Sequence, residues 1–228
     1  SFLFQLSSRI GFSHQDLFRF IVNNACLRRD IAISFKNVFL NEIDEGRKPV
    51  AVLFGGNTAE KQVSLMSGTN VWLKLRSSKI YKPYPYLLDK NKEVWELPYF
   101  YILNHTVEEI IQNAKNATRD VKKLFFLIEK VKIKLFLKKT DATEKFFMPK
   151  KYPIDQILKK YKFVFLALHG GFGEDGTIQR ILENKKIKYN GSGSATSKLC
   201  IDKWETNEFI GKSNILGVSA VKHVLLKV

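Results

Sequence analysis

Apolar runs alternate along this chain with stretches whose apolar residues recur every three or four positions. Two runs, Val50–Phe54 and Phe163–Leu168, are apolar throughout, which is typical of strands buried on both faces of a parallel sheet. Glycines follow each run, and a helical pattern follows the glycines. The pattern therefore predicts two strand, loop, helix units and an α/β fold with an open, mainly parallel sheet flanked by helices.

The second unit has the longer loop. Four of the eight residues in His169–Gly176 are glycines, which excludes a helix there and favours positive φ angles. Thr177 is a suitable N-cap for the helix that follows. The apolar stripe of this helix consists of Ile178, Ile181 and Leu182.

The first unit runs from a strand at Val50–Gly56 into a helix that Thr58 can cap, with Glu60 in its first turn. Its glycines match neither the dinucleotide fingerprint nor the phosphate loop, so Gly55 and Gly56 alone predict no nucleotide site. The apolar positions of the predicted helix are Val63, Met66, Val71 and Leu75.

Weaker patterns predict the remaining elements. Seven lysines interrupt the apolar residues of Val121–Lys139. They argue against a transmembrane helix, but a helix that lies in the membrane interface is still an alternative. Alternation at Val131–Leu135 favours an exposed strand or hairpin. The other predicted elements are short strands at Tyr84–Leu88 and Val94–Leu97 around a turn at Asp89–Asn91, and helices at Gln15–Ala25, Val107–Ala117 and Ile154–Tyr161.

The N-terminal region admits two interpretations. Residues 1–29 contain one acid, several arginines and several serines, a composition that fits an organelle-targeting segment. The amphipathic pattern at Gln15–Ala25 fits the end of a preceding module equally well. The polar stretch Asn41–Pro49 is the expected linker.

Composition indicates an ordinary globular protein with a strong basic excess. The formal charge is +16, but 30 of the 38 basic residues are lysines, whereas readout of bases and phosphates prefers arginine. We therefore expect no specific nucleic-acid binding. Cys26 and Cys200 form no disulfide framework, which fits a reducing compartment, and the four scattered histidines predict no metal site.

Candidate chemistry lies where the two strands end. Ligands of open α/β sheets bind beyond the carboxyl ends of the strands, and parallel strands bring Glu60 and His169 to one such edge. Glu60 is suited to pairing with a substrate ammonium group, although it also complements a helix dipole. Glu174 and Asp175 precede a helix, where a structural role and a functional role are about equally expected.

Three motifs resemble the N-terminal part of D-alanine:D-alanine ligase. They are AVLFGGNTAEKQVSLMSG, FLALHGGFGEDGTIQRILE and YNGSGSATSKLCIDK, and they occur in the family's order over Val50–Ile210. The resemblance implies a Rossmann-like preATP-grasp domain at residues 48–201 with an insertion around 99–150. Residues 1–47 would be an extension or the end of a preceding module, and 202–228 the start of an ATP-grasp region that is otherwise missing.

The resemblance also implies roles for single residues. Glu60 would pair with the ammonium group of the first D-alanine, with Val63 beside its methyl group. Ser64 would support Glu60, which makes Glu60, Ser64 and His169 the implied catalytic residues. His169 would hydrogen-bond the substrate carboxylate, next to Gly170 of the same loop.

The same resemblance implies cofactors and partners. Glu174 would orient the glycine loop, and Lys203 would lie near the phosphates of ATP. Family members use ATP with Mg²⁺ or Mn²⁺ to phosphorylate the first D-alanine, whose acyl phosphate the amine of the second then attacks. The metal ligands would lie outside this chain. A homodimer in the cytoplasm is the implied state, and we expect the chain alone to be an inactive fragment.

Other functions stay open from the sequence alone. One is a non-catalytic amino-acid-binding or regulatory module that kept the sheet and lost ligation. Another is a basic interaction module whose binding to polyanions collapses with salt. A related ligase that makes D-alanyl-D-lactate or D-alanyl-D-serine is a third, because the residues that select the second substrate are not in this chain.

Overall fold

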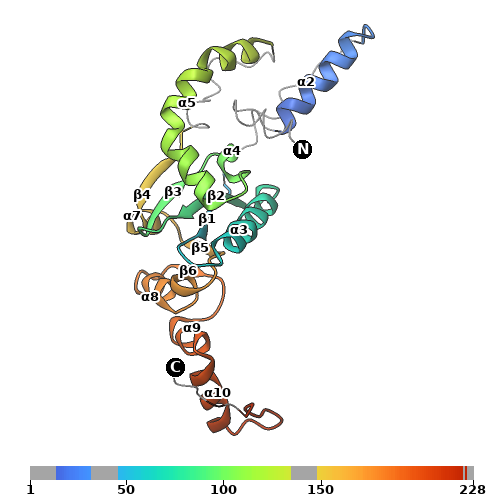
Figure 1. Cartoon of the computed structure of the whole chain (residues 1–228). Coiled ribbons are helices and arrows are strands. Elements are labelled where there is room, and N and C mark those ends of the chain that lie inside the picture. The colour runs from blue at the N-terminus through green and yellow to red at the C-terminus, as the bar shows by residue number, and fades with distance from the viewer. Residues whose placement is uncertain (1–13, 32–45, 135–147, 223, 225–228) are drawn as a thin grey trace.

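The computed structural model describes residues 14–31, 46–134, 148–222 and 224 (Figure 1). The strands are β1 (Lys48–Gly55), β2 (Tyr81–Leu88), β3 (Glu93–Glu96), β4 (Lys150–Pro153), β5 (Phe163–Leu166) and β6 (Lys188–Tyr189). The helices are α2 (His14–Leu27), α3 (Lys61–Arg76), α4 (Tyr99–Ile102), α5 (Val107–Lys134), α7 (Ile154–Leu158), α8 (Thr177–Asn184), α9 (Ser194–Ile201) and α10 (Lys203–Lys212), with a 3₁₀ turn, η1 (Gly171–Gly173).

One sheet organises the chain, with the strand order β4-β3-β2-β1-β5-β6. β1 pairs in parallel with β2 and β5, and β5 pairs in parallel with β6, whereas β3 and β4 run antiparallel at one edge. This mainly parallel sheet with flanking helices confirms the predicted α/β class.

β2 begins earlier than its apolar pattern indicated. The predicted strand started at Tyr84, but pairing with β1 starts at Tyr81 and passes through Pro83 and Pro85. Only Tyr86–Leu88 also pair with β3, so Pro83 lies where β2 has a partner on one side only. Pro85 lies next to the β3 ladder, where its carbonyl accepts a 3.1 Å hydrogen bond from the N–H of Leu97. β5 ends at Leu166, two residues before the predicted end.

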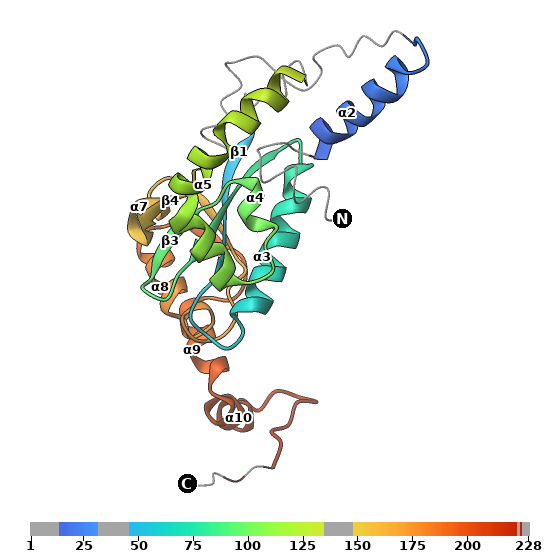
Figure 2. The same cartoon turned by 45° about the horizontal axis from the view of Figure 1, so that its top comes forward.

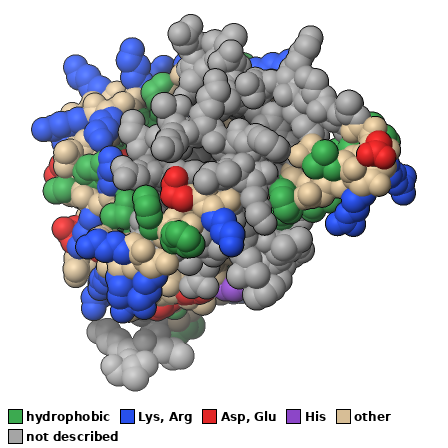
Figure 3. All heavy atoms as spheres, turned by 90° about the horizontal axis from the view of Figure 1, so that it is seen from above, with side chains coloured by type: hydrophobic (Ala, Val, Ile, Leu, Met, Phe, Trp, Pro, Cys, Tyr) green, Lys and Arg blue, Asp and Glu red, His purple; other side chains and the backbone are tan. Residues whose placement is uncertain are grey.

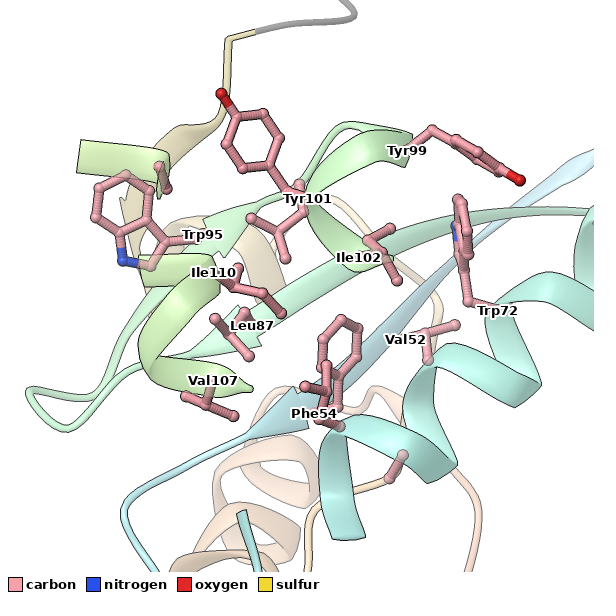
Figure 4. Packing of buried hydrophobic residues seen from close by; sticks show 14 of the residues in the cluster. Val52, Phe54, Trp72, Leu87, Trp95, Tyr99, Tyr101, Ile102, Val107 and Ile110 are labelled. Carbon is pink, nitrogen blue, oxygen red and sulfur yellow. The ribbon is translucent and has the colours of Figure 1, made fainter. Parts of the chain in front are cut away.

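The sheet separates two apolar clusters. Alternate residues of β1 enter them, because successive side chains of a strand point to opposite faces. Figure 4 shows Val52 and Phe54 on the first face, with side chains from α3, α4 and α5 around them. Ala51 and Leu53 enter the second cluster, which α7 and α8 cover. The domain thus has three layers, helices on both sides of one sheet (Figures 1 and 2).

The apolar pattern misjudged the packed face of α3. Val63 and Met66 are 51% and 72% exposed, although Val71 and Leu75 do pack against the first cluster. The residues buried along this helix are Ser64, Leu65, Gly68 and Trp72. Counting apolar side chains missed this face because two of its four buried residues are a serine and a glycine.

α5 is longer than predicted and replaces the expected strand or hairpin. The helix continues from Val107 to Lys134, so Val131–Lys134 are helical, while Leu135 lies outside the described residues. Its first part is buried at Val107 and Ile110, but Phe126 further along is 81% exposed. The period-two pattern was too short to outweigh the helix propensity of the lysines around it.

The other predictions have mixed outcomes. The N-terminal helix is confirmed as α2, and the turn after β2 is confirmed by the Asp89 carboxylate, which accepts hydrogen bonds from the backbone of Asn91 and Glu93. The helix after β4 ends at Leu158 instead of Tyr161. β4 and β6 had not been predicted. Within the described residues, no helix is both long enough and apolar enough to cross a membrane.

Candidate functional site

The loops after β1 and β5 meet at the carboxyl edge of the sheet, as their parallel pairing requires. The Thr58 hydroxyl donates a 2.8 Å hydrogen bond to the carbonyl of His169. Gly170 lies so close to Glu60 that a Cβ atom at Gly170 would be 3.0 Å from Glu60 Oε2. The predicted placement of Glu60 and His169 at one edge is thereby confirmed.

A buried serine joins the two strand ends beneath these loops. The Ser64 hydroxyl accepts a 2.8 Å hydrogen bond from the backbone N–H of Gly55 and donates a 2.7 Å bond to the carbonyl of Ala167. Its side chain is completely buried. Ser64 therefore links β1, α3 and the residue that follows β5. Because both hydrogen bonds of the Ser64 hydroxyl go to backbone groups of the protein, this side chain positions the strand ends.

The ring of His169 lies between a hydroxyl and a carboxylate. Ser67 Oγ is 3.1 Å from Nε2, and Glu174 Oε1 is 3.8 Å from Nδ1. About a third of the histidine side chain and half of the glutamate side chain are exposed to solvent. Sequence reasoning missed Ser67. Its signal was the serine one helical turn after Ser64, on the side of α3 that faces the edge of the sheet.

Glu60 occupies the N-cap position of α3 but does not cap the helix. Its side chain makes no capping hydrogen bond, and Thr58, the predicted cap, bonds to the other loop. The predicted cap was wrong because the helix begins at Lys61, later than the pattern indicated. The Glu60 carboxylate is exposed beside the dipole of α3. Val63 is half-exposed one turn further along the same helix.

The two acids of the second loop have different surroundings. Asp175 Oδ1 accepts a 2.8 Å hydrogen bond from the backbone N–H of Thr177, so Asp175 shapes the start of α8. Glu174 faces His169 instead. Thr177 is the first residue of the helix, and Gly176 takes the N-cap position with φ 85°. A Cβ atom at Gly176 would lie 2.3 Å from the Ser194 carbonyl, which explains why glycine stands there.

The third motif supports the loops through its polar side chains. The Asn190 side chain bonds both the N–H and the carbonyl of Leu166, at 2.6 and 3.0 Å, and so continues the ladder beyond β6. The Glu183 carboxylate accepts hydrogen bonds from Tyr189 and from the N–H and hydroxyl of Ser194. The Ser194 and Tyr189 hydroxyls lower the pKa of Glu183 to about 2. None of these contacts was foreseen.

Lys203 is not part of this constellation. It is the first residue of α10, whose N-cap is Asp202, and it lines a hollow of about 520 Å³ with Trp204 and Ile210. Across the described residues, no hydrogen bond or ion pair joins Lys203 to Glu60 or His169. Nor do three or more His, Cys, Asp or Glu side chains gather in a metal-binding group there.

The arrangement can bind a small zwitterion. The Glu60 carboxylate, which makes no capping hydrogen bond to α3, provides a partner for an ammonium group. His169 provides a polar ring nitrogen for a carboxylate, and the half-exposed Val63 provides an apolar contact.

Comparisons with known proteins match this part of the chain. Residues 49–192 match the family described as D-ala D-ala ligase N-terminus. The chain is 33% identical over 171 residues to a D-alanine–D-alanine ligase of Pediococcus pentosaceus, an alignment that covers 73% of this chain and 43% of that protein. It is 37% identical over 115 residues to that of Clostridium botulinum, covering 48% of this chain and 34% of the relative.

A solved structure shows the same fold. The D-alanine-D-alanine ligase from Coxiella burnetii has a TM-score of 0.51 and 20% sequence identity, covering 74% of this chain and 43% of that one. This chain therefore spans less than half the length of the curated relatives that it matches.

Proposed function

Because the chain belongs to the D-alanine–D-alanine ligase family through the family's N-terminal domain, we propose that it forms the first D-alanine site of an ATP-dependent ligase. The complete reaction would join two D-alanines into the dipeptide used in peptidoglycan. The site at the carboxyl edge lies within residues 49–192, the region that matches the family. The proposal for this chain is therefore limited to the first D-alanine site, because the chain covers 43% of its relative from Pediococcus pentosaceus.

One observation carries the proposal: the Glu60 carboxylate and the His169 loop lie against each other. Gly170 has no side chain, and a Cβ atom there would approach Glu60 Oε2 to 3.0 Å. An amino-acid zwitterion needs an anion for its ammonium group and a donor for its carboxylate within a few ångströms of each other. We assign these roles to Glu60 and His169, with Val63 beside the D-alanine methyl group.

The remaining residues of the site are assigned supporting roles. Ser67 and Glu174 hold the ring of His169 from two sides, at 3.1 and 3.8 Å, so that it keeps one orientation toward the substrate. Ser64 fixes the distance between the two strand ends, so its contribution to catalysis acts through the position of the loops. With the Ser67 hydroxyl donating to Nε2, the N–H of His169 is at Nδ1, where Glu174 at 3.8 Å is too distant for a hydrogen bond. His169 then donates from Nδ1 to the carboxylate that becomes phosphorylated, and does not act as a general base.

The phosphate chemistry is proposed for the whole protein only. ATP would supply the phosphoryl group that converts the carboxylate of the first D-alanine into an acyl phosphate. Inorganic phosphate would then leave when the amine of the second D-alanine attacks the acyl carbon, and Lys203 would contact the nucleotide phosphates. The described residues contain no metal-binding cluster, so no step at Mg²⁺ or Mn²⁺ is assigned to this part of the chain. A homodimer and a cytoplasmic location are proposals that rest on the family alone.

Calorimetric titration with D-alanine tests the site. We expect D-alanine to bind in preference to L-alanine, and Glu60→Gln to weaken binding at least tenfold, since a charge-assisted hydrogen bond contributes about 1.5–3 kcal/mol. His169→Ala should lose a similar factor. Glu205→Gln, which removes an exposed carboxylate from α10, should bind as the unmodified chain does.

The same titration distinguishes the alternatives. Binding that needs no ATP, together with no ATP-dependent phosphate release by the full-length protein, would favour an amino-acid-binding or regulatory module. D-Alanine binding that is unchanged by Glu60→Gln and His169→Ala would rule out this site as the first D-alanine site.

A further inference from the structure

A groove of about 1360 Å³ crosses the amino edge of the sheet, opposite the site described above. Its walls come from the first residues of β1 and β2, from β5, and from the chain around the end of α7 and between α8 and β6. The loops that carry Glu60 and His169 leave the strands at their other ends. The groove is therefore independent of the proposed D-alanine site.

Lysine dominates the rim of this groove. Of the sixteen described residues that line it, seven are lysines and none is acidic, whereas the whole chain has 30 lysines in 228 residues. Composition alone would place about two lysines in a set of this size. Figure 3, a view of the molecule from above, shows more Lys and Arg than Asp and Glu side chains among the coloured residues on that side as a whole. The groove lysines are Lys48, Lys159, Lys160, Lys162, Lys185, Lys186 and Lys188.

Helix dipoles explain only part of this cluster. Lys159 and Lys160 follow α7, and Lys185 and Lys186 follow α8, so these four complement the carboxyl ends of helices. Of the other three, Lys48 and Lys188 begin β1 and β6 and Lys162 comes directly before β5, where no helix dipole favours a cation. Among the described residues, the only ion pair of a groove lysine joins Lys185 to Asp155, at 3.1 Å. Within the described residues, six of the seven groove lysines therefore have no carboxylate within ion-pair distance, although Lys160 Nζ lies 4.6 Å from the ring centre of Tyr152.

The floor of the groove is apolar. Val50, Leu158 and Ile187 line it from the buried core, and Phe163 and Phe165 add half-buried rings. Tyr81, on the rim at the start of β2, is 39% exposed. An occupant must therefore combine negative charges at its sides with an apolar surface at its centre.

We propose that this groove binds an acidic segment of another polypeptide that carries apolar side chains at its centre. Charge complementarity between the lysine rim and carboxylates would orient the segment, and apolar side chains would cover the floor. A second copy of this chain would bring one lysine rim against another and is disfavoured. Nucleic acid is a poorer fit because the described lining residues include no arginine, and among them only Tyr81 offers a well-exposed ring for stacking. A flat lipid surface cannot reach the floor of a groove.

Fluorescence anisotropy with a labelled peptide of about twelve alternating glutamates and leucines tests the proposal. We expect the 228-residue chain to bind it. Replacing Lys159, Lys160 and Lys162 by glutamine should weaken binding about tenfold. The matched control replaces Lys115, Lys122 and Lys123, exposed lysines of α5, by glutamine and should change affinity less than twofold. A peptide with serine in place of leucine should bind more weakly than the original.

Three results would overturn the proposal. Equal losses in the groove and control variants would show that binding follows net charge alone. Tighter binding of an oligonucleotide or of phosphatidylserine vesicles, lost in the groove variant, would assign the groove to another class of partner. No binding of the glutamate-leucine peptide at low salt would exclude an acidic segment. D-Alanine titration of the same variants, which should be unchanged, keeps this result separate from the proposed function.

Discussion

The two strand, loop, helix units of this domain look alike in sequence but build the site differently. In the unit β1–α3, the helix itself carries the polar side chains Ser64 and Ser67, and Glu60 comes directly before it. In the unit β5–α8, the loop carries His169 and Glu174, while α8 buries Ile178 and Leu182 in the second cluster. One helix takes part in the site, and the other only supports it.

The difference follows from the face of the sheet that each helix covers. α3 packs on the first cluster so closely that its residues reach the end of the neighbouring strand β5, as the bond from Ser64 to Ala167 shows. α8 packs on the opposite face, and the longer loop, with η1 inside it, spans the edge between them. A site built in this way depends on the close approach of α3 to the sheet, and the following substitutions test that dependence.

The largest effect is expected from Gly68→Ala. A Cβ atom at this position would lie 2.5 Å from the side chain of Phe54, so α3 would have to move away from β1. We expect a loss of about 3 kcal/mol in the free energy of unfolding, measured by denaturant titration. Gly211→Ala, in α10, is the control. A Cβ atom at Gly211 would lie 3.4 Å from the Cβ atom of Ala220, which is an ordinary van der Waals distance. Equal stability of both variants would show that α3 is not packed this closely.

Ser64→Ala should be the next most harmful change. It removes two buried hydrogen bonds and leaves the Gly55 N–H and the Ala167 carbonyl without this partner. We expect a loss of about 2 kcal/mol in the free energy of unfolding. Ser67→Ala removes a hydroxyl from the same helix that is only partly buried, and it should cost well under half as much. If the two serine variants were equally stable, the link between the units through Ser64 would be unimportant.

Ser67→Ala should act on binding instead. Without the Ser67 hydroxyl, the His169 ring keeps its contact with Glu174 but loses the hydrogen bond at Nε2. The ring is then less well oriented, so the proposed hydrogen bond to D-alanine weakens. We expect a three- to tenfold loss of D-alanine affinity by calorimetry, about the contribution of one hydrogen bond. Affinity equal to that of the unmodified chain would remove Ser67 from the site.

The smallest effect is expected in the supporting unit, from Glu183→Gln. Hydrogen bonds from Ser194 and Tyr189 hold the pKa of Glu183 at about 2, below its ordinary value of 4.5. Because folding lowers the pKa of Glu183, its ionised carboxylate stabilises the fold at pH values above 4.5, and this stabilisation is lost as the pH falls toward 2. The melting temperature of the variant should therefore be lower by a few degrees or less near pH 7, and this difference should shrink by about pH 3.

Glu205→Gln provides the control for this pH dependence, since Glu205 lies in the first turn of α10, away from Tyr189 and Ser194. A difference between Glu183→Gln and the unmodified chain that stays constant from neutral to acidic pH would show that ionisation of Glu183 does not strengthen the contact.

Several features could be predicted because they depend on local or periodic properties. The buried strands β1 and β5 were evident from their apolar runs, and their parallel pairing placed Glu60 and His169 at one edge. The bounds of α5 could not be predicted, because a few alternating residues did not outweigh the helix propensity around them. The packed face of α3 was also missed, since Ser64 and Gly68 are not apolar.

The sequence by itself determined the fold class, the order of the two units, the glycine loops and the family. Only the tertiary structure decided which of Glu174 and Asp175 faces His169, that Ser64 is a buried link, that Ser67 contacts the histidine, and that lysines from separate segments surround one groove. The physical reason is the range of the interactions. Apolar periodicity and backbone freedom are properties of neighbouring residues, whereas these contacts join residues far apart in the chain, such as Ser67 and His169, whose positions depend on how closely the helices pack on the sheet.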